Sequence, residues 1–581
     1  MNSILKTDFY KVTHMLQYRD NITHFTSYLT PRGSRFQSID KMVVFGIANF
    51  VNEYLFKGFN EEFFNVEWPV VRNEVVEVLE KGLGYPQRLV NNTLVKIGAL
   101  HNLGYLPIEI NGLPEGSICP MQVPAIEIRS TDFAFAWVAQ SIESLLSCEF
   151  WHPTMSATIA HEYAKIAKAA YDKTVCGVDY KTAMCDFSMR GQESYESAVA
   201  SGAGFLTSFY NCSTVESRYY IKRNYVHGDE VRVNGLTSTE HSVMCSDFSL
   251  CGDERETLKR LLTEVYPDVS FSAVSDSYDF WHLVTEILPT LKEEIENHKG
   301  FIGIRHDSDE PVHALCGIKN INLNKILCGK PEVNNFEDFE NLVYEAVNDD
   351  LCLNDDEEAY FEYKFKDTTY KGVFGITSYA ESYDHKGRGW IAYETAYLRE
   401  EKTPEDKGLV EVLYELFGGE KNDKGYIVIN PKVKAVYGDS ITIPRAKKIY
   451  KRLEKKGFAA NNVSLGVGSF SMECLEEDGV LKPFTRDSFS IAVKATYGRK
   501  RTANGEVGFP IFKDPKGCKS KKSLKGLCRV VKEDGEFKVI QNLTEEKYNA
   551  YQTHEMVNYF KDGKPVKYSF EDVRNRLEEN I

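Results

Sequence analysis

Three short segments rich in aspartate each follow a run of apolar residues. They are 274–279 (VSDSYD), 304–309 (IRHDSD) and 436–440 (VYGDS). In a parallel α/β fold the carboxyl ends of the strands meet at one edge, where such folds hold their chemistry. Carboxylates there could bind sugar hydroxyls, and Arg305 could bind phosphate oxygens. Asp and Ser also cap helices, but three segments in corresponding places favour a site for a phosphorylated sugar.

Other segments carry residues that could take part in the same chemistry. Phe187 offers a flat apolar face and Arg190 a planar donor for phosphate. His241, next to Glu240, could act as acid, base or phosphoryl acceptor. The turn 465–470 (LGVGSF) would let backbone N–H groups approach a phosphate, although it is not a complete phosphate-binding fingerprint. Taken singly, a core Phe beside a solvated Arg explains the first two residues equally well, and a surface His–Glu pair is the simpler explanation of the third.

The elements that must position these residues alternate between short strands and helices from about residue 183. The predicted strand and helix pairs are 183–187 with 191–201, 269–274 with 278–288, and 433–436 with 443–454. This alternation predicts a parallel α/β sheet or barrel. Before it, 41–56 and 69–83 have the apolar spacing of helices. Between 317 and 402 the alternation stops, which indicates an insertion.

Composition limits the class of protein. A chain of 581 residues exceeds one hydrophobic core, so two or three domains are expected. The net charge of −15 argues against a role in binding nucleic acid or a membrane surface. No run of about 18 uncharged apolar residues and no apolar signal core are present, which predicts a cytoplasmic protein. The 13 cysteines form no CxxC pair, so we expect reduced cysteines, with Cys148, Cys212 and Cys316 in the core.

Read together, these segments resemble the nicotinate phosphoribosyltransferase family. The opening segment 7–14 (TDFYKVTH) is close to the family's TDSYKVTH. The matching segments that follow in family order are 106–110 with 114–116, 186–191, 240–242, 275–279, 305–308, 438–439, 485–487 and 512–515. The resemblance covers nearly the whole chain apart from the insertion.

The resemblance implies an α/β fold: an irregular α/β barrel of the type II phosphoribosyltransferase kind, with a second α+β domain built from both termini. The implied parts are 1–150 (α+β domain), 151–316 (barrel), 317–402 (insertion on the barrel rim), 403–490 (barrel) and 491–581 (completion of the α+β domain). It also implies a homodimer with shared active sites.

The reaction that the resemblance implies joins nicotinamide to phosphoribosyl pyrophosphate, giving the mononucleotide and pyrophosphate in NAD salvage. Phe187 and Tyr10 resemble the rings that sandwich the pyridine, with Tyr10 from the partner subunit. Asp307 resembles the catalytic carboxylate, and His241 the histidine that ATP phosphorylates. The other implied substrate-binding residues are Arg190, Ser213, Asp276, Arg305, Gly438, Asp439, Gly468, Ser469 and Arg486, assisted by Arg32, Lys494 and Lys513. Mg²⁺ is expected to travel with the pyrophosphate, and ATP to be a co-substrate.

Three features depart from the family pattern. Where members acting on nicotinamide carry an aspartate that accepts a hydrogen bond from the carboxamide, gapless counting from Phe187 reaches Ser213. His306 stands where proline is usual and Asp309 where glycine is usual. The insertion has no counterpart in compact members. Ser213 keeps open the alternative of a nicotinate phosphoribosyltransferase, and a catalytically silent nucleotide-binding protein is the alternative from another class.

Overall fold

The computed structural model describes residues 2–327, 329, 331–348, 358–381, 391–514 and 523–581. The chain forms two compact units. Unit 1 comprises Met1–Ala164, Asp186–Gly235 and Ser469–Ile581, and unit 2 comprises Lys165–Cys185 and Leu236–Gly468. Unit 1 is thus assembled from both ends of the sequence.

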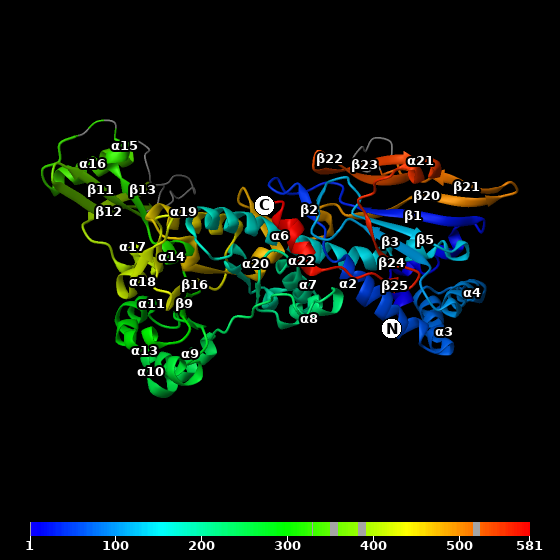
Figure 1. Ribbon diagram of the computed structural model, residues 1–581, viewed down its shortest axis with the longest axis horizontal. Helices are drawn as coiled ribbons and strands as arrows, with labels where there is room; N and C mark the ends of the chain where they lie inside the picture. Colours follow the sequence, from blue (N-terminus) through cyan, green and yellow to red (C-terminus); the bar gives the residue numbers. More distant parts are fainter. Residues whose placement is uncertain (1, 328, 330, 349–357, 382–390, 515–522) are drawn as a thin grey trace. The chain divides into compact units, whose positions relative to one another are not determined.

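A seven-stranded sheet forms the centre of unit 1, with the strand order β21-β20-β1-β5-β3-β24-β25 (Figure 1). Its strands are β1 (Ile22–Thr30), β3 (Ile108–Gly112), β5 (Ile126–Ser130), β20 (Ala492–Thr502), β21 (Gly505–Pro510), β24 (Val557–Lys561) and β25 (Lys564–Pro565). All the neighbouring pairs are antiparallel. The N-terminal β1 lies between β5 and the C-terminal β20, so residues more than 460 positions apart in the sequence are paired, such as Thr30 with Ala492.

Helices complete unit 1. The longer ones are α3 (Trp68–Glu77), α4 (Gln87–Leu103), α6 (Glu143–Thr174, which continues into unit 2), α7 (Tyr195–Phe205), α8 (Val215–Asn224) and α22 (Phe570–Glu578). A core of Phe45, Leu206, Ile221, Phe570 and other buried side chains joins residues from all three segments of the unit. The predicted helix over 69–83 is confirmed by α3 and η5 (Val78–Gly82). The prediction for 41–56 is wrong at its start, because Lys41–Val43 form β2, which pairs with β4 (Ile118–Pro120).

Unit 2 is built on a parallel sheet, and the aspartate-rich segments lie where they were predicted. The strands β8 (Phe271–Val274), β9 (Ile302–His306), β16 (Val433–Tyr437) and β17 (Val463–Val467) pair in the order β17-β16-β9-β8. β6 (Met184–Asp186) follows β17 in the sheet order. Ser275, Asp307 and Gly438 come directly after β8, β9 and β16. The three polar segments therefore share the carboxyl edge of one sheet.

Helices lie between these strands along the chain, as in α/β folds. They include α9 (His241–Cys251), α10 (Glu254–Arg260), α11 (Phe280–His282), α14 (Pro311–Cys316), α18 (Leu409–Phe417) and α19 (Ile443–Lys456). The sequence sets the ends of α19 locally: the Thr442 hydroxyl accepts the Arg445 N–H, and Gly457 ends the helix in the left-handed region at φ +83°. Buried Ala446, Ile449 and Leu453 give this helix its apolar face.

The insertion contains a module with a hydrophobic core of its own. β10 (Lys319–Asn322), β11 (Glu358–Phe365), β12 (Thr368–Glu381) and β13 (Ile391–Arg399) form a sheet in that order. α16 (Phe336–Asn348) contributes Phe339, Leu342 and Val343 to a core that also holds Phe361 and Phe374.

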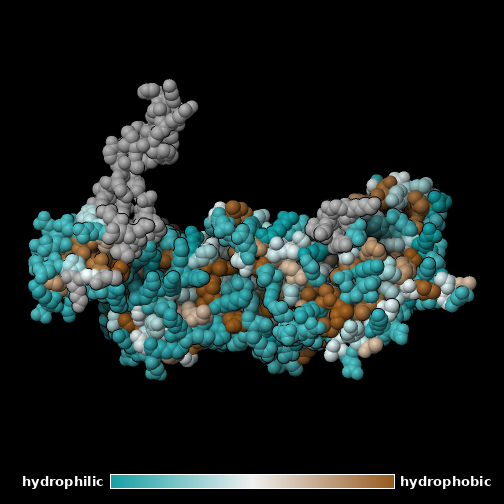
Figure 2. Space-filling view, turned by 90° about the horizontal axis from the view of Figure 1, so that it is seen from above, coloured by the Kyte–Doolittle hydropathy of each residue, from teal (hydrophilic) through white to brown (hydrophobic). Residues whose placement is uncertain are grey.

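The side of the molecule seen in Figure 2 is mainly hydrophilic, with scattered apolar patches. Among the helices that the structure describes, none is both long and apolar enough to cross a bilayer. The described cysteines are free; Cys212 and Cys316 are buried as expected, whereas Cys148 is exposed.

Candidate active site

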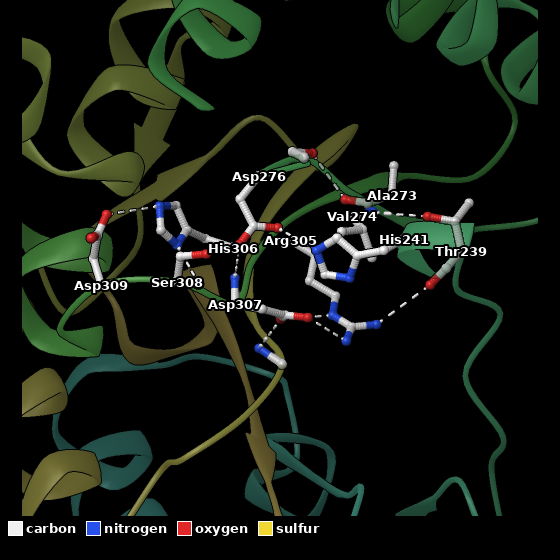
Figure 3. A network of polar contacts seen from close by, with 12 residues as sticks. Thr239, His241, Ala273, Val274, Asp276, Arg305, His306, Asp307, Ser308 and Asp309 are labelled. Carbon is white, nitrogen blue, oxygen red and sulfur yellow. Dashed lines mark hydrogen bonds and ion pairs between the residues drawn. The ribbon is translucent and has the colours of Figure 1, made fainter. Parts of the chain in front are cut away.

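The centre of the polar network in unit 2 is an ion pair between Arg305 and Asp307 (Figure 3). Asp307 Oδ1 accepts from Arg305 Nε at 2.9 Å and Oδ2 accepts from Nη2 at 2.5 Å, a bidentate arrangement. Only 11% and 15% of the two side chains are exposed. Removing either partner would leave the other as a largely buried charge, which is strongly destabilising. This geometry fixes the orientation of both groups at the end of β9.

Asp276 connects this pair to His241. Its Oδ2 accepts the backbone N–H of Asp307 at 3.0 Å and the Ser308 hydroxyl at 2.5 Å. Its Oδ1 lies 3.4 Å from His241 Nε2. Burial raises the pKa of Asp276, but the hydrogen bonds from Ser308 and Asp307 outweigh it and lower the pKa below its ordinary value. The carboxylate is therefore ionised and holds the Asp307–Ser308 turn beside the histidine.

His241 is the first residue of α9 and its side chain is 52% exposed. A helix N-terminus favours negative charge, so it would stabilise a phosphoryl group carried on this ring. The sequence suggested Glu240 as the partner of His241. In the structure Glu240 instead accepts the Ser242 hydroxyl, and the histidine faces Asp276.

The two glycines predicted to line the phosphate pocket leave no room for a side chain. A Cβ on Gly438 would lie 2.2 Å from Asp307 Oδ1. The same oxygen accepts the Gly438 N–H at 3.1 Å. A Cβ on Gly468 would lie 2.1 Å from Asp439 Oδ1. Close approach of backbone and carboxylate, rather than backbone flexibility, explains the glycine at these two strand ends.

Within unit 1, Ser213 occupies a defined position. Its hydroxyl donates to the backbone carbonyl of Asp186 at 2.7 Å, and its N–H donates to the same oxygen at 3.0 Å. Phe187, half-buried, follows that residue directly, and Arg190 is exposed on η8 (Met189–Gly191). Because the hydroxyl proton of Ser213 is already used, its oxygen can only accept from a ligand.

Three of the predicted cations line one hollow in unit 1. Arg32, Lys494 and Lys513 border a cavity of about 600 Å³, together with Lys525 and the ring of Phe512. Arg486 pairs with Asp487 at 2.8 Å and is not part of this lining. Ser469 lies against Gly191, where an added Cβ would be 2.1 Å from its hydroxyl. Tyr10 is 61% exposed beside Phe9, which is 57% exposed.

Sequence reasoning missed several members of the unit 2 network. Arg305 Nη1 donates to the Ser238 hydroxyl at 3.2 Å and to the Thr239 carbonyl at 3.5 Å. The Tyr437 hydroxyl donates to the carbonyls of Ser308 and Asp309 at 3.0 and 2.7 Å. The only available signal for Thr239 was its place just before the Glu240–His241 segment. Tyr437 lay within the segment 436–440 that was singled out, but nothing in the sequence marked its hydroxyl as part of the network.

Comparison with known proteins identifies the family. The model of the nicotinate phosphoribosyltransferase family matches residues 182–349 and 395–552, more than half of the chain. The chain belongs to this family. The model of the N-terminal domain of nicotinamide phosphoribosyltransferase matches residues 2–70. This phosphoribosyltransferase is therefore a pentosyltransferase by family.

Curated relatives of this chain carry the name nicotinamide phosphoribosyltransferase, and two of them illustrate the similarity. The protein from Acinetobacter baylyi is 31% identical over 100% of this chain and 98% of its own length. The protein from Mycoplasma pneumoniae is 25% identical over 82% of this chain and 87% of its own. Among solved structures, human nicotinic acid phosphoribosyltransferase aligns with a TM-score of 0.47 and 11% identity, covering 99% of this chain and 93% of that one.

Proposed function

We propose that this protein transfers the phosphoribosyl group of phosphoribosyl pyrophosphate to nicotinamide. The pyridine nitrogen supplies the electron pair for the new bond to the ribose C1, and the bond from C1 to the pyrophosphate oxygen breaks with its electrons. The products are nicotinamide mononucleotide and pyrophosphate. Family membership together with the Arg305–Asp307–Asp276 network at the sheet edge supports this proposal.

We assign the charges of the reaction to specific residues. Positive charge develops on the sugar as pyrophosphate departs, and we assign its stabilisation to the Asp307 carboxylate. We assign Arg305 of unit 2 to the leaving phosphates. For Arg190, Arg486, Arg32, Lys494 and Lys513 of unit 1, phosphate binding stays the role that the family resemblance implies. Stacking on Phe187 would hold the weakly nucleophilic ring nitrogen in line. Asp439, Gly468 and Ser469 are assigned to the ribose and its phosphate.

Nicotinamide, rather than nicotinate, is the base that Ser213 favours. The hydroxyl donates to Asp186 at 2.7 Å, so its oxygen offers lone pairs that suit a carboxamide N–H and repel a carboxylate. Ser213 thus supplies a hydrogen-bond acceptor at the position where family members acting on nicotinamide carry an aspartate. A nicotinate phosphoribosyltransferase would instead benefit from a donor at this position.

Steady-state rates with nicotinamide and nicotinate, each with phosphoribosyl pyrophosphate and Mg²⁺, test the proposal. We expect a higher kcat/KM for nicotinamide, and Ser213→Ala should reduce the ratio of the two values about fivefold, the effect of one hydrogen bond of about 1 kcal/mol. A higher kcat/KM for nicotinate would show that the protein is a nicotinate phosphoribosyltransferase instead. Release of no pyrophosphate with either base would leave only a binding protein.

ATP enters the proposal through His241. Phosphorylation would transfer the γ-phosphoryl group of ATP to a ring nitrogen of His241, releasing ADP, and water would later remove it as phosphate. The exposed ring at the N-terminus of α9 suits a phosphoryl acceptor. We expect His241→Ala to abolish stimulation by ATP with the fold intact, and His227→Ala, which removes an exposed histidine paired with Glu230, to retain it. Full ATP stimulation of His241→Ala would contradict the role.

Mg²⁺ is assigned to the substrate rather than to the protein. Among the described residues, no three His, Cys, Asp or Glu side chains come together as a metal site. The oxygens of pyrophosphate are ligands that Mg²⁺ prefers, and it usually keeps few protein ligands in such sites. The metal would neutralise charge on the leaving group.

We further propose a homodimer in which Tyr10 of each subunit completes the site of its partner. The adjacent exposed rings of Phe9 and Tyr10 support an intermolecular contact. Mixing Tyr10→Ala protein with Phe187→Ala protein should restore activity through hybrid dimers that retain one intact site. Phe133→Ala, which removes another ring that is 60% exposed, should need no such rescue. A monomer in light scattering, or no activity on mixing, would refute shared sites.

A further inference from the structure

His306 and Asp309, the two departures from the family pattern at the end of β9, are neighbours in space (Figure 3). His306 Nε2 lies 3.6 Å from Asp309 Oδ2. The His306 side chain is 2% exposed, whereas that of Asp309 is 74% exposed. Asp309 adopts φ +67°, a left-handed conformation that aspartate tolerates better than most residues. The paired positions indicate a function shared by the two side chains.

The ring of His306 is held on several sides. The Phe280 ring lies edge-on with centroids 4.0 Å apart, and the Tyr437 ring is nearly parallel at 6.0 Å. In the strand register His306 pairs with Tyr437, and Arg305 pairs with Val436. Successive side chains of a strand point to opposite faces. His306 thus lies behind the Arg305–Asp307 pair rather than beside it.

The backbone N–H of Ser308 donates to His306 Nδ1 at 3.2 Å. A ring nitrogen accepts only when it carries no proton, so the ring is neutral with its proton on Nε2, the nitrogen nearest Asp309. The same turn is held by Asp276, which accepts from the Asp307 N–H and the Ser308 hydroxyl. His306 and Asp276 together therefore fix the backbone that carries the Asp307 carboxylate.

We propose that His306 is a positioning residue of the phosphoribosyl transfer: its neutral ring holds the Asp307–Ser308 turn, and a proton on Nδ1 releases that turn. The inference rests on the proposed function, in which Asp307 stabilises the sugar. Protonated Nδ1 becomes a donor facing another donor, so the Ser308 N–H bond is lost. Asp309 faces the opposite nitrogen and stabilises the charged ring that results. Activity thereby becomes sensitive to acid through a group that does not touch the substrate.

Charged and titratable groups from three neighbouring strands face the His306 ring. Asp276 follows β8, Asp307 and Asp309 follow β9, and the Tyr437 hydroxyl belongs to β16; Phe280 of α11 is uncharged. Burial lowers the pKa of His306, and the three carboxylates together with a backbone hydrogen bond to Ser308 oppose that effect. The folded-state pKa lies below the ordinary value, so the ring is neutral at pH 8 and takes up its proton on the acid side.

Two substitutions separate positioning from packing. Asn places an oxygen as many bonds from Cβ as Nδ1, whereas Gln places its oxygen at the distance of Nε2. His306→Asn should therefore accept the Ser308 N–H and retain most of the wild-type kcat at pH 8. His306→Gln should lower kcat about 100-fold, the effect of displacing the Asp307 carboxylate by about 1 Å.

The pH profile of kcat supplies the second test. As the pH is lowered past about 6.5, the ordinary pKa of histidine, wild-type kcat should decrease. The profile should show an inflection that His306→Asn lacks. Asp309→Asn should move the inflection to lower pH, because it removes a carboxylate that favours the charged ring. Since all variants use the same substrates, ionisation of the substrate phosphates cancels in the comparison.

Protein labelled with ¹⁵N-histidine gives a readout independent of turnover. His306 is assigned by the signal that His306→Asn loses, and it should show the Nε2–H tautomer at pH 8. An Nδ1–H tautomer, or equal kcat values for the Asn and Gln variants, would overturn the inference while the enzyme remained active. A wild-type protein that forms no mononucleotide would instead refute the proposed function, and the inference with it.

Discussion

Substitution of Gly438 by alanine is the sharpest test of the network in unit 2. The new Cβ would lie 2.2 Å from Asp307 Oδ1 and 2.3 Å from Arg305 Nε. Contacts of carbon with oxygen or nitrogen need more than 3 Å, so one of these groups must move by about 1 Å. Neither is free to move, because each is held by the bidentate pair and Asp307 also accepts the Gly438 N–H.

The cost follows from these contacts. Overpacking by one methyl group costs about 1–3 kcal/mol, and loss of the charged hydrogen bond from Gly438 costs about 1.5–3 kcal/mol. A displacement of about 1 Å at a catalytic group lowers the rate about 100-fold. We therefore expect Gly438→Ala to reduce kcat/KM at least 100-fold and the melting temperature by several degrees.

The assay is mononucleotide formation with varied phosphoribosyl pyrophosphate, alongside thermal unfolding. Gly235→Ala is the matched control, since an added Cβ there has nothing within 4 Å and its φ is not in the left-handed region. Its kcat/KM should equal that of the wild type. If Gly438→Ala also keeps the wild-type kcat/KM, the Asp307–Arg305 pair is not part of the catalytic machinery.

Three further predictions concern single side chains. Asp307→Ala should lower kcat by several powers of ten and, because it strands the largely buried Arg305, also destabilise unit 2 by about 3–5 kcal/mol; unchanged kcat per folded molecule would mean a purely structural carboxylate. Ser213→Asp should raise the nicotinamide-to-nicotinate ratio of kcat/KM by repelling the carboxylate, corresponding to about 1–3 kcal/mol, whereas an unchanged ratio would make Ser213 a packing residue. His24 has its pKa lowered to about 4 by burial and by nearby Arg129 and Arg499. Because the unfolded chain binds this proton first, its contribution to stability is complete above about pH 6.5 and is lost towards pH 4, by about 3 kcal/mol; His24→Gln should flatten urea-unfolding free energies over that range, and an unaltered pH dependence would contradict it.

The sequence by itself determined the α/β strand ends and the candidate residues on them. Apolar runs followed by aspartate placed Ser275, Asp307 and Gly438 after three strands, as the structure has them, because strand length and turn chemistry are local properties. The ends of α19 were equally local, set by Thr442 and Gly457. Family order in the motifs extended this to the type of reaction.

The tertiary structure decided which of these residues interact. No local pattern shows that Lys41–Val43 pairs with Ile118–Pro120, or that β1 pairs with β20, since such pairings depend on chain segments that are distant in sequence. The proximity of Asp276 to His241, the tautomer of His306 and the direction of the Ser213 hydroxyl are likewise invisible in the sequence. A side chain's acceptors and donors are fixed by neighbours that folding brings within 3 Å, so hydrogen-bond direction belongs to the fold and not to the residue type.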